Sequence, residues 1–311
     1  MRNFKTLSII VVALLVTIFS CKKEEEITIP YNCTANMMAD QLSEATKTGT
    51  YSLTDSQLQI TGQSGTMVDF LGTSFVDADG NSIDGIIDIE FIDAQDNKDM
   101  LLMNTPTLTN TGQLLVSGGI FAFNPSQNGQ DIYIANGSSI NVTMNTNDTV
   151  NTMTIYTGSV NEDGEFVWTE TQQTVPTGAS DFSTDNTGWV NLDYPLPPCT
   201  GTLTIDLPNG RNGNNSAVMV YFASINSVVT AYDWDADGSF QVENLLCDSA
   251  YVQYVVISQI EGVRSYHVSY LQPVDLLNTN IFTASYSLTS DSMKIVLCDD
   301  ALRLLIQDEL E

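Results

Sequence analysis

Hydrophobic and polar positions alternate in short segments along most of the chain. The segments 83–94 (IDGIIDIEFIDA) and 113–123 (QLLVSGGIFAF) are examples, rich in Ile, Val and Phe and bounded by Gly, Asn or Asp. This alternation is typical of strands with one buried face. The chain is therefore predicted to be all-β, with two β-sandwiches of immunoglobulin-like or transthyretin-like type. Helical spacing occurs only at the margins, at Met38, Leu42 and Ala45 and again at Leu302, Leu305 and Ile306, where a closing strand is the alternative.

Pairs of Asp or Asn with Gly separate many of these segments. Because both residue types tolerate positive φ, we expect each pair to form a two-residue hairpin turn with both residues at positive φ. The pairs are Asp79-Gly80, Asp84-Gly85, Asn136-Gly137, Asp163-Gly164 and Asp237-Gly238.

Prolines are densest at DYPLPPC, where Pro195, Pro197 and Pro198 should extend and stiffen the chain. This stretch is the predicted domain boundary. The predicted organisation is a signal peptide (1–20), a stalk with a short helix (21–50), a first β-sandwich (51–194) and a second, smaller one (195–311).

The N-terminus has the order of a secretory signal: Arg2 and Lys5, an apolar run at 7–19, and the small Ser20 before Cys21. The stretch Ile18-Phe19-Ser20-Cys21 resembles the lipobox of bacterial lipoproteins. That resemblance implies cleavage before Cys21, a diacylglycerol on its sulfur and a further acyl chain such as palmitate on its amine. Several acyl chains bind a bilayer far more firmly than one, at about 0.8 kcal/mol per buried methylene.

The charges that follow, Cys-Lys-Lys-Glu-Glu-Glu, resemble the tag that directs Bacteroidetes lipoproteins to the outer face of the outer membrane. The predicted location is therefore the outer membrane, lipid-anchored and facing the cell exterior, with the periplasmic face as the alternative.

Charge excludes one class of partner. The chain has 38 acidic and 10 basic residues, a net charge of -28. A nucleic-acid binder needs a basic surface to displace counterions, so nucleic acid is excluded as a partner. Solubility is one interpretation of the acidity, and binding of divalent cations is another.

Four cysteines remain after lipidation: Cys33, Cys199, Cys247 and Cys298. In an oxidising compartment they could form disulfides in any of three pairings, or stay as free buried thiols. The absence of CxxC and the single histidine argue against a zinc cluster.

Several spaced motifs carry a family resemblance. Gly-Thr before an apolar strand, Phe-x-Asp-x-x-Gly, Ser-x-Gly-x-Phe and Gly-Trp-x-Asn-x-Asp together resemble a group of Bacteroidetes lipoproteins of uncharacterised function. The first part is also similar to ZU5 interaction modules, and the hairpin around Asp237 to carboxypeptidase-regulatory-like (transthyretin-like) modules. These resemblances imply a scaffold and no chemistry. The motif residues are Gly65, Thr66, Phe75, Asp77, Gly80, Ser117, Gly119, Phe121, Gly188, Trp189, Asn191 and Asp193.

Catalytic signatures are missing from the sequence. His267 is the only histidine, and no Gly-x-Ser-x-Gly elbow, phosphate loop or dinucleotide fingerprint accompanies it. A strand histidine without a catalytic role is the preferred interpretation, and no enzymatic activity is predicted. A glycosidase, which needs only two carboxylates, is the rival.

Two groups of residues are candidate binding sites. Asp233, Asp235 and Asp237 with Gly238 match the first half of a calcium loop, but the bidentate glutamate at its end is missing, so an acidic hairpin turn is the preferred interpretation and structural calcium the alternative. Trp168, Trp189 and Trp234 could stack on sugar rings, or could be core residues. Thr149, Ser249 and Ser292 lie in tripeptides that resemble the Bacteroidetes O-glycosylation sequon.

The function predicted from all these features is that of a non-catalytic envelope lipoprotein, a surface module that binds a glycan or protein partner. A carbohydrate-active protein of the outer membrane is the alternative.

Overall fold

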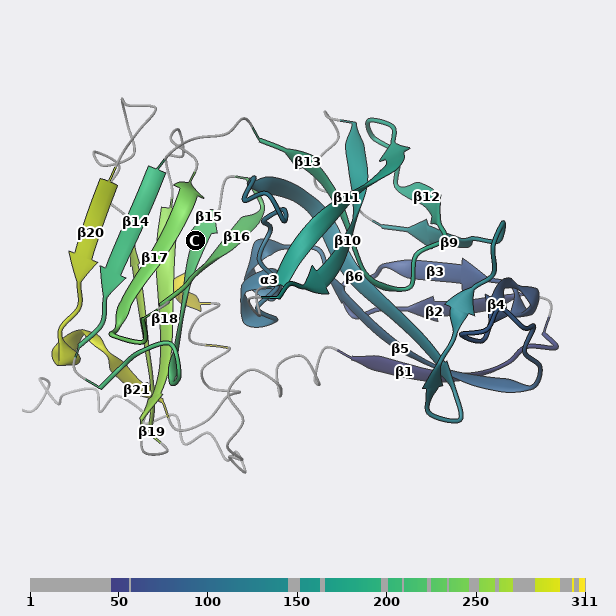
Figure 1. Cartoon of the computed structure of the whole chain (residues 1–311), viewed down its shortest axis with the longest axis horizontal. Helices are drawn as coiled ribbons and strands as arrows, with labels where there is room; N and C mark the ends of the chain where they lie inside the picture. Colours follow the sequence, from purple (N-terminus) through teal and green to yellow (C-terminus); the bar gives the residue numbers. More distant parts are fainter. Residues whose placement is uncertain are drawn as a thin grey trace, which may run out of the picture. The chain divides into compact units, whose positions relative to one another are not determined.

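A computed structural model describes most of the chain from residue 46 onward. The described residues are 46–55, 57–144, 152–162, 166–196, 201–208, 210–222, 225–233, 235–245, 252–260, 263–270, 283–296, 304 and 308–310. All of them belong to one compact unit, Cys33–Glu311. Strands dominate, and the predicted all-β fold with little helix is confirmed (Figure 1).

A seven-stranded antiparallel sheet forms one layer of the first sandwich. Its order is β1-β5-β6-β13-β10-β11, with β7 paired to β6. Its strands are β1 (Lys47–Ser52), β5 (Ile86–Ala94), β6 (Leu115–Gln127), β7 (Gln130–Asp131), β10 (Met153–Val160), β11 (Phe166–Val175) and β13 (Gly188–Pro195).

The opposite layer is a four-stranded sheet of order β12-β9-β3-β2, beside which β4 and β8 form a separate pair. The short turn η1 (Gly72–Ser74) leads into β4. The strands are β2 (Leu58–Thr61), β3 (Met67–Phe70), β4 (Phe75–Val76), β8 (Tyr133–Ile134), β9 (Ile140–Thr143) and β12 (Asp181–Thr184).

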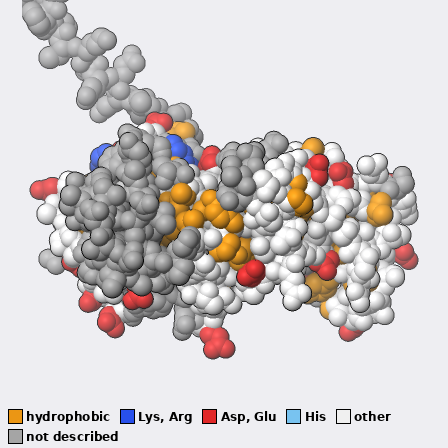
Figure 2. Space-filling model, turned by 90° about the horizontal axis from the view of Figure 1, so that it is seen from above, with side chains coloured by type: hydrophobic (Ala, Val, Ile, Leu, Met, Phe, Trp, Pro, Cys, Tyr) orange, Lys and Arg blue, Asp and Glu red, His pale blue; other side chains and the backbone are white. Residues whose placement is uncertain are grey.

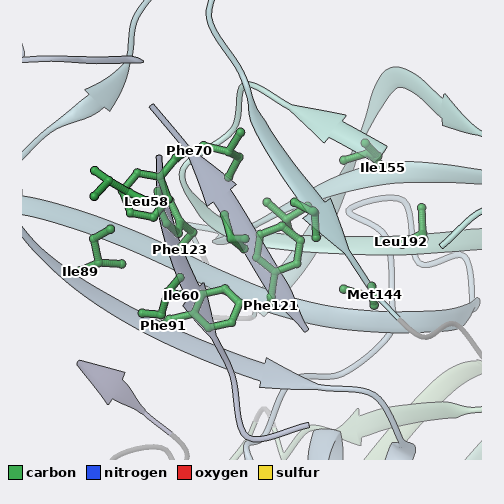
Figure 3. Close-up of a cluster of buried hydrophobic side chains, with 14 of the residues drawn as sticks. Leu58, Ile60, Phe70, Ile89, Phe91, Phe121, Phe123, Met144, Ile155 and Leu192 are labelled. Atoms are coloured by element: carbon green, nitrogen blue, oxygen red, sulfur yellow. The ribbon is translucent and has the colours of Figure 1, made fainter. Parts of the chain in front are cut away.

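Apolar side chains from both layers meet in one core. Phe70 lies edge-on to Phe123 at 5.7 Å between ring centroids, and Phe91 contacts Phe121 at 6.0 Å. Figure 3 shows these rings converging with Ile60 of β2 between the sheets. Alternation places every second residue of β5 in this core, because successive strand side chains point to opposite faces.

The second sandwich has a three-stranded and a five-stranded sheet, in the orders β17-β14-β20 and β16-β15-β18-β19-β21. In the first of these sheets, β14 and β20 pair in parallel. The elements are β14 (Gly201–Asp206), β15 (Ser216–Phe222), β16 (Ser227–Ala231), β17 (Ser239–Leu245), β18 (Val252–Ile260), β19 (Val263–Tyr270), β20 (Thr283–Ser287), η2 (Ser290–Ser292) and β21 (Lys294–Val296).

This second sandwich has its own core, built mainly from aliphatic side chains such as Val218, Val220 and Val256. Leu114, which precedes β6 of the first sandwich, is buried in it. β13 ends at Pro195 and β14 begins at Gly201, so the proline-rich stretch lies where the chain changes sheet. That residues 51–194 and 195–311 are separate domains stays a prediction.

The expectation that helix is confined to the margins is wrong. Residues 97–102 form the helix α3 (Asn97–Leu102), in which Met100, Leu101 and Leu102 are buried. The Asp96 side chain caps it by accepting a hydrogen bond from the Asp99 backbone N–H. One capped turn buries three consecutive apolar residues, and so short a helix shows no 3.6-residue period.

The expected turn geometry is also wrong in detail. Gly80, Gly85, Gly137 and Gly238 have positive φ, but their Asp or Asn partners do not. The two-residue hairpin with both residues at positive φ is instead Asn128-Gly129 (φ 52° and 75°), which joins β6 to β7. Pairing on both sides of the turn decides which geometry forms, and a dipeptide does not carry that information.

The predictions for the N-terminal 45 residues lie outside the described residues, as does Asp163-Gly164. No helix among the described residues has the length and apolarity needed to cross a membrane.

Candidate binding cleft

Many of the sequence-predicted site residues lie outside the described part of the chain. These are Cys21, Cys33, Cys199, Cys247, Cys298, Trp234, Thr149 and Ser249. Lipidation, disulfide formation and modification at these positions stay predictions. The third sequon residue, Ser292, is half-buried in η2, and its Oγ lies 3.0 Å from Oγ1 of Thr289.

The two described tryptophans stand on β11 and β13, on either side of β10, and both contact the same phenylalanine. Trp168 is fully buried, and its indole N–H donates to the Pro106 carbonyl oxygen at 2.7 Å. Trp189 is half-buried. Phe166 lies edge-on to both, at 5.0 Å from Trp168 and 5.7 Å from Trp189 between ring centroids. Trp168 therefore has no ring face open to a ligand, and it supports Phe166 instead.

Phe166 lines a cleft of about 300 Å³. Tyr232 supplies a second aromatic ring, and neutral polar groups of Thr, Asn and Gln supply hydrogen-bonding capacity. The lining residues are Leu108, Thr109, Asn110, Gly112, Phe166, Val167, Thr230, Tyr232, Gln241, Val242 and Glu243. This mixture of rings and neutral polar groups is typical of small-molecule sites.

Backbone pairing builds both walls of the cleft. On one side, the Trp168 N–H donates to the Leu108 carbonyl at 3.0 Å, and the Asn110 N–H donates to the Trp168 carbonyl at 2.9 Å. On the other, Tyr232 and Gln241 exchange two backbone hydrogen bonds of 2.8 Å. Because these bonds fix the backbone, the cleft is formed before any ligand arrives.

Two other hollows among the described residues have different linings. One of about 400 Å³ is lined by Asp93, Asp96 and Asp99 without an aromatic ring. The other, of about 480 Å³, is lined mainly by Ser and other polar residues around Leu71. The cleft at Phe166 is therefore the one that combines two rings with neutral polar groups.

Among the residues that line the cleft, Glu243 is the only carboxylate. His267 is elsewhere, on β19, where Nδ1 lies 2.9 Å from the Ser292 carbonyl oxygen and the ring packs on Tyr254. Figure 2 shows acidic side chains scattered over the visible described surface rather than gathered at one point. The cleft thus offers shape and hydrogen bonds, with one negative charge.

Two aspartates of the predicted calcium loop, Asp233 and Asp237, accept hydrogen bonds from backbone N–H groups in and beside the turn. Asp233 Oδ2 accepts from the N–H of Gly213 and Gly238, both at 2.9 Å, and Oδ1 accepts from the N–H of Asp237 at 3.1 Å. Asp237 Oδ1 accepts from the Ser239 N–H. Among the described residues no three carboxylate, histidine or cysteine side chains are grouped as a metal site. Calcium binding at Asp233, Asp235 and Asp237 stays the untested alternative to an acidic turn.

The motif residues behave differently from one another. Asp77 organises an exposed turn, because its carboxylate accepts from the N–H of Asp79 and from the backbone and side-chain N–H groups of Asn81. The side-chain bond from Asn81 is the main reason that the pKa of Asp77 is lowered. Ser117 and Asn191, from two separate motifs, are brought into direct contact in the interior.

Phe166 and Tyr232 were not singled out in the sequence. Both lie beside residues that were singled out, since Phe166 is two residues before Trp168 and Tyr232 directly precedes Asp233. Their convergence depends on the pairing of β11 with the loop at 108–110 and of β17 with Tyr232, which no local pattern reveals.

Comparison with known proteins gives no match: no family model fits any part of the chain, and no curated protein is significantly similar to it.

Proposed function

We propose that this protein is a non-catalytic binding module, attached to the outer membrane through an acylated Cys21, that takes its ligand in the cleft beside Phe166. The observation that carries the proposal is the lining of that cleft, with Phe166 and Tyr232 among neutral polar side chains. Binding without reaction is favoured because Glu243 is the only titratable carboxylate among the lining residues, whereas hydrolysis of a glycosidic bond uses two.

A glycan is the ligand class that suits this lining best. Sugar rings present apolar C–H faces that pack on aromatic rings and hydroxyls that pair with amides and hydroxyls. Thr230, Asn110 and Gln241 provide such groups around the two rings. A protein partner would use a larger and flatter surface than a cleft of this volume.

Calorimetric titration of the purified protein with a panel of soluble oligosaccharides tests the proposal. We expect at least one to bind, with affinity reduced about tenfold or more by Phe166→Ala, since losing one stacked ring costs about 1–2 kcal/mol. Tyr133→Ala is the matched control, because Tyr133 is an exposed aromatic on β8 outside the lining. Unchanged affinity in Phe166→Ala would contradict the proposed site.

Glu243→Gln separates binding from catalysis. We expect this variant to retain most of the affinity, and the wild type to leave the bound oligosaccharide intact on prolonged incubation, as analysed by chromatography. Cleavage products that disappear in Glu243→Gln would establish the hydrolase alternative instead.

The location is tested on intact cells. Fatty-acid labelling that depends on Cys21, followed by removal of the folded part with external protease, is the expected result. Labelled protein that external protease does not reach would place it in the periplasm, and unlabelled wild type would contradict the anchor.

A further inference from the structure

Three buried side chains form a connected row across two strands of the first sandwich. Ser117 Oγ on β6 donates to Asn191 Oδ1 on β13 at 2.7 Å, and Asn191 Nδ2 lies 2.5 Å from Asp193 Oδ2. Asp193 is paired with Ser117 across the two strands, which places the carboxyl beside the hydroxyl. The exposed fractions are 1% for Ser117 and 0% for Asn191 and Asp193. A hydroxyl, a carboxamide and a carboxyl thus contact one another without water access.

A β-bulge places the hydroxyl in this row. Asn191 pairs with Ile120 and Asp193 with Ser117, so β6 has one extra residue between the two pairs. Gly118 and Gly119 form this bulge, and Gly119 has φ 141°. A Cβ on Gly118 would lie 2.7 Å from Met153 Sδ, and one on Gly119 2.5 Å from Met144 Sδ. The Ser-Gly-Gly sequence therefore sets the position of Ser117.

The carboxyl of Asp193 is buried without a full set of hydrogen bonds. Its Oδ1 is buried and has no hydrogen-bond partner among the described residues. Burial raises the pKa of Asp193 well above its usual value, while the neighbouring Ser117 hydroxyl acts in the opposite direction. A carboxyl whose proton is held more firmly than usual can take a proton from a neighbour and return it, which is what general acid–base catalysis requires.

We infer that Ser117 and Asn191 become joined by an intramolecular ester. Ser117 Oγ attacks Cγ of Asn191, and the hydroxyl proton passes to the carboxylate form of Asp193. The Cγ–Nδ2 bond then breaks, Asp193 returns the proton to Nδ2, and ammonia leaves. One C–O bond forms, one C–N bond breaks, no electrons are lost or gained, and no co-reactant is needed.

The fold supplies the two conditions that this reaction needs. Nucleophile and acceptor are held in hydrogen-bond contact by paired strands, which replaces an encounter in solution with a fixed geometry. Exclusion of water strengthens the interactions of the carboxyl and prevents hydrolysis of the ester once formed. The product would tie β6 covalently to β13 inside the seven-stranded sheet.

The same chain contains a matched internal control. Ser183 Oγ donates to Asn141 Oδ1 at 2.7 Å, between the paired strands β12 and β9, but both residues are exposed. The hydroxyl–amide contact is identical in length, and the buried acid and the dry surroundings are missing. We expect no ester between Ser183 and Asn141.

The test is peptide mapping by mass spectrometry of the full-length protein purified from its native membrane. We expect one cross-linked pair that joins the peptides of Ser117 and Asn191 and is lighter than their sum by one ammonia. The pair should be absent in Ser117→Ala and in Asp193→Asn, whereas peptides of Ser183 and Asn141 stay unlinked.

Three results would overturn the inference or part of it. Wild-type peptides of Ser117 and Asn191 recovered separately at unmodified mass would show that no ester forms, irrespective of how the variants fold. An ammonia loss at Asn191 that persists in Ser117→Ala would indicate cyclisation of Asn191 on its own backbone. A cross-link retained in Asp193→Asn would overturn the role of Asp193. None of these outcomes bears on the ligand cleft.

Discussion

Two aspartates in the same seven-stranded sheet are almost equally buried but are held in opposite ways. Asp93 on β5 is 1% exposed, and both of its oxygens accept from backbone N–H groups, of Ser64 at 3.1 Å and Thr66 at 3.0 Å. Asp193 on β13 is fully buried, and its oxygens meet only side chains, with Oδ1 left without a partner. Backbone amides make Asp93 a structural anchor, whereas Asp193 is left able to exchange a proton.

The loop around Asp93 positions the two backbone amides that donate to its carboxylate. It turns at Gly65, which has φ 92°, and closes with a hydrogen bond from the Gly62 N–H to the Thr66 carbonyl. A Cβ on Gly62 would lie 2.2 Å from the Asp93 carboxylate. The Gly-Thr motif, Gly65 and Thr66, therefore lets the backbone turn around the Asp93 carboxylate. Asp193 has no loop of this kind.

The largest expected effect comes from removing the anchored carboxylate. Asp93→Ala leaves two inward-facing N–H groups without acceptors, so we expect the free energy of unfolding to fall by about 3 kcal/mol. Urea denaturation measures this loss. Asp131→Ala, at an exposed site, should change it by less than about 0.5 kcal/mol. A loss under about 1 kcal/mol for Asp93→Ala would mean that the amides do not depend on this carboxylate.

The second prediction concerns pH and Asp193. Below the usual aspartate pKa of about 4 the carboxyl is protonated in both states. As pH rises, the unfolded chain ionises while the folded chain, whose pKa is raised, keeps its proton. Folding stability should therefore fall by up to about 1.4 kcal/mol per pH unit until the folded pKa is reached.

Comparing Ser117→Ala with Ser117→Ala/Asp193→Asn isolates this contribution, because both variants lack the hydroxyl and so the ester. Denaturation of the two variants between pH 4 and 8 should give curves that diverge with rising pH, the single variant losing more stability. Parallel curves would show that Asp193 ionises as readily in the folded protein as in the unfolded chain.

A third carboxylate extends the comparison to the second sandwich. Asp233 accepts three backbone N–H groups, one more than Asp93, but it is only half-buried, so Asp233→Ala should lower the free energy of unfolding by about 1 kcal/mol. The exposed Asp235→Ala is the control. Because both Asp233 oxygens are occupied, we expect the same Tm in calcium and in EDTA. A calcium-dependent rise in Tm that Asp233→Ala abolishes would establish the metal site.

The smallest expected effect is at the exposed Asp77. Hydrogen bonds from Asn81, with lesser ones from Asp79 and Gly80, lower its pKa. An NMR titration should show a midpoint below the usual aspartate value, and Asn81→Ala should move it upward. The associated stability is present above the usual aspartate pKa and is lost as pH falls through the lowered one. A midpoint that Asn81→Ala leaves unchanged would assign the shift to other groups.

Local sequence was sufficient to predict the strands and to single out the motif residues, but not to assign the roles of those residues. Alternation in 83–94 predicted β5 and places Asp93 on the same face as Phe91, but it gave no sign of which groups would pair with the buried carboxylate. The helix at Asn97 was missed because a single turn has no period. Phe166 and Tyr232 were missed because a cleft is a property of segments far apart in the chain.

By itself, the sequence determined that the described chain folds into strands. Apolar and polar side chains alternate with a period of two, and a strand with that pattern buries its apolar face while its polar face stays in water. Strand pairing was decided only in three dimensions. β13 lies between β6 and β10, so Ser117 and Asn191 meet although 74 residues separate them. The physical reason is that pairing minimises exposed apolar surface and unpaired backbone over the whole sheet, a non-local quantity that no segment contains.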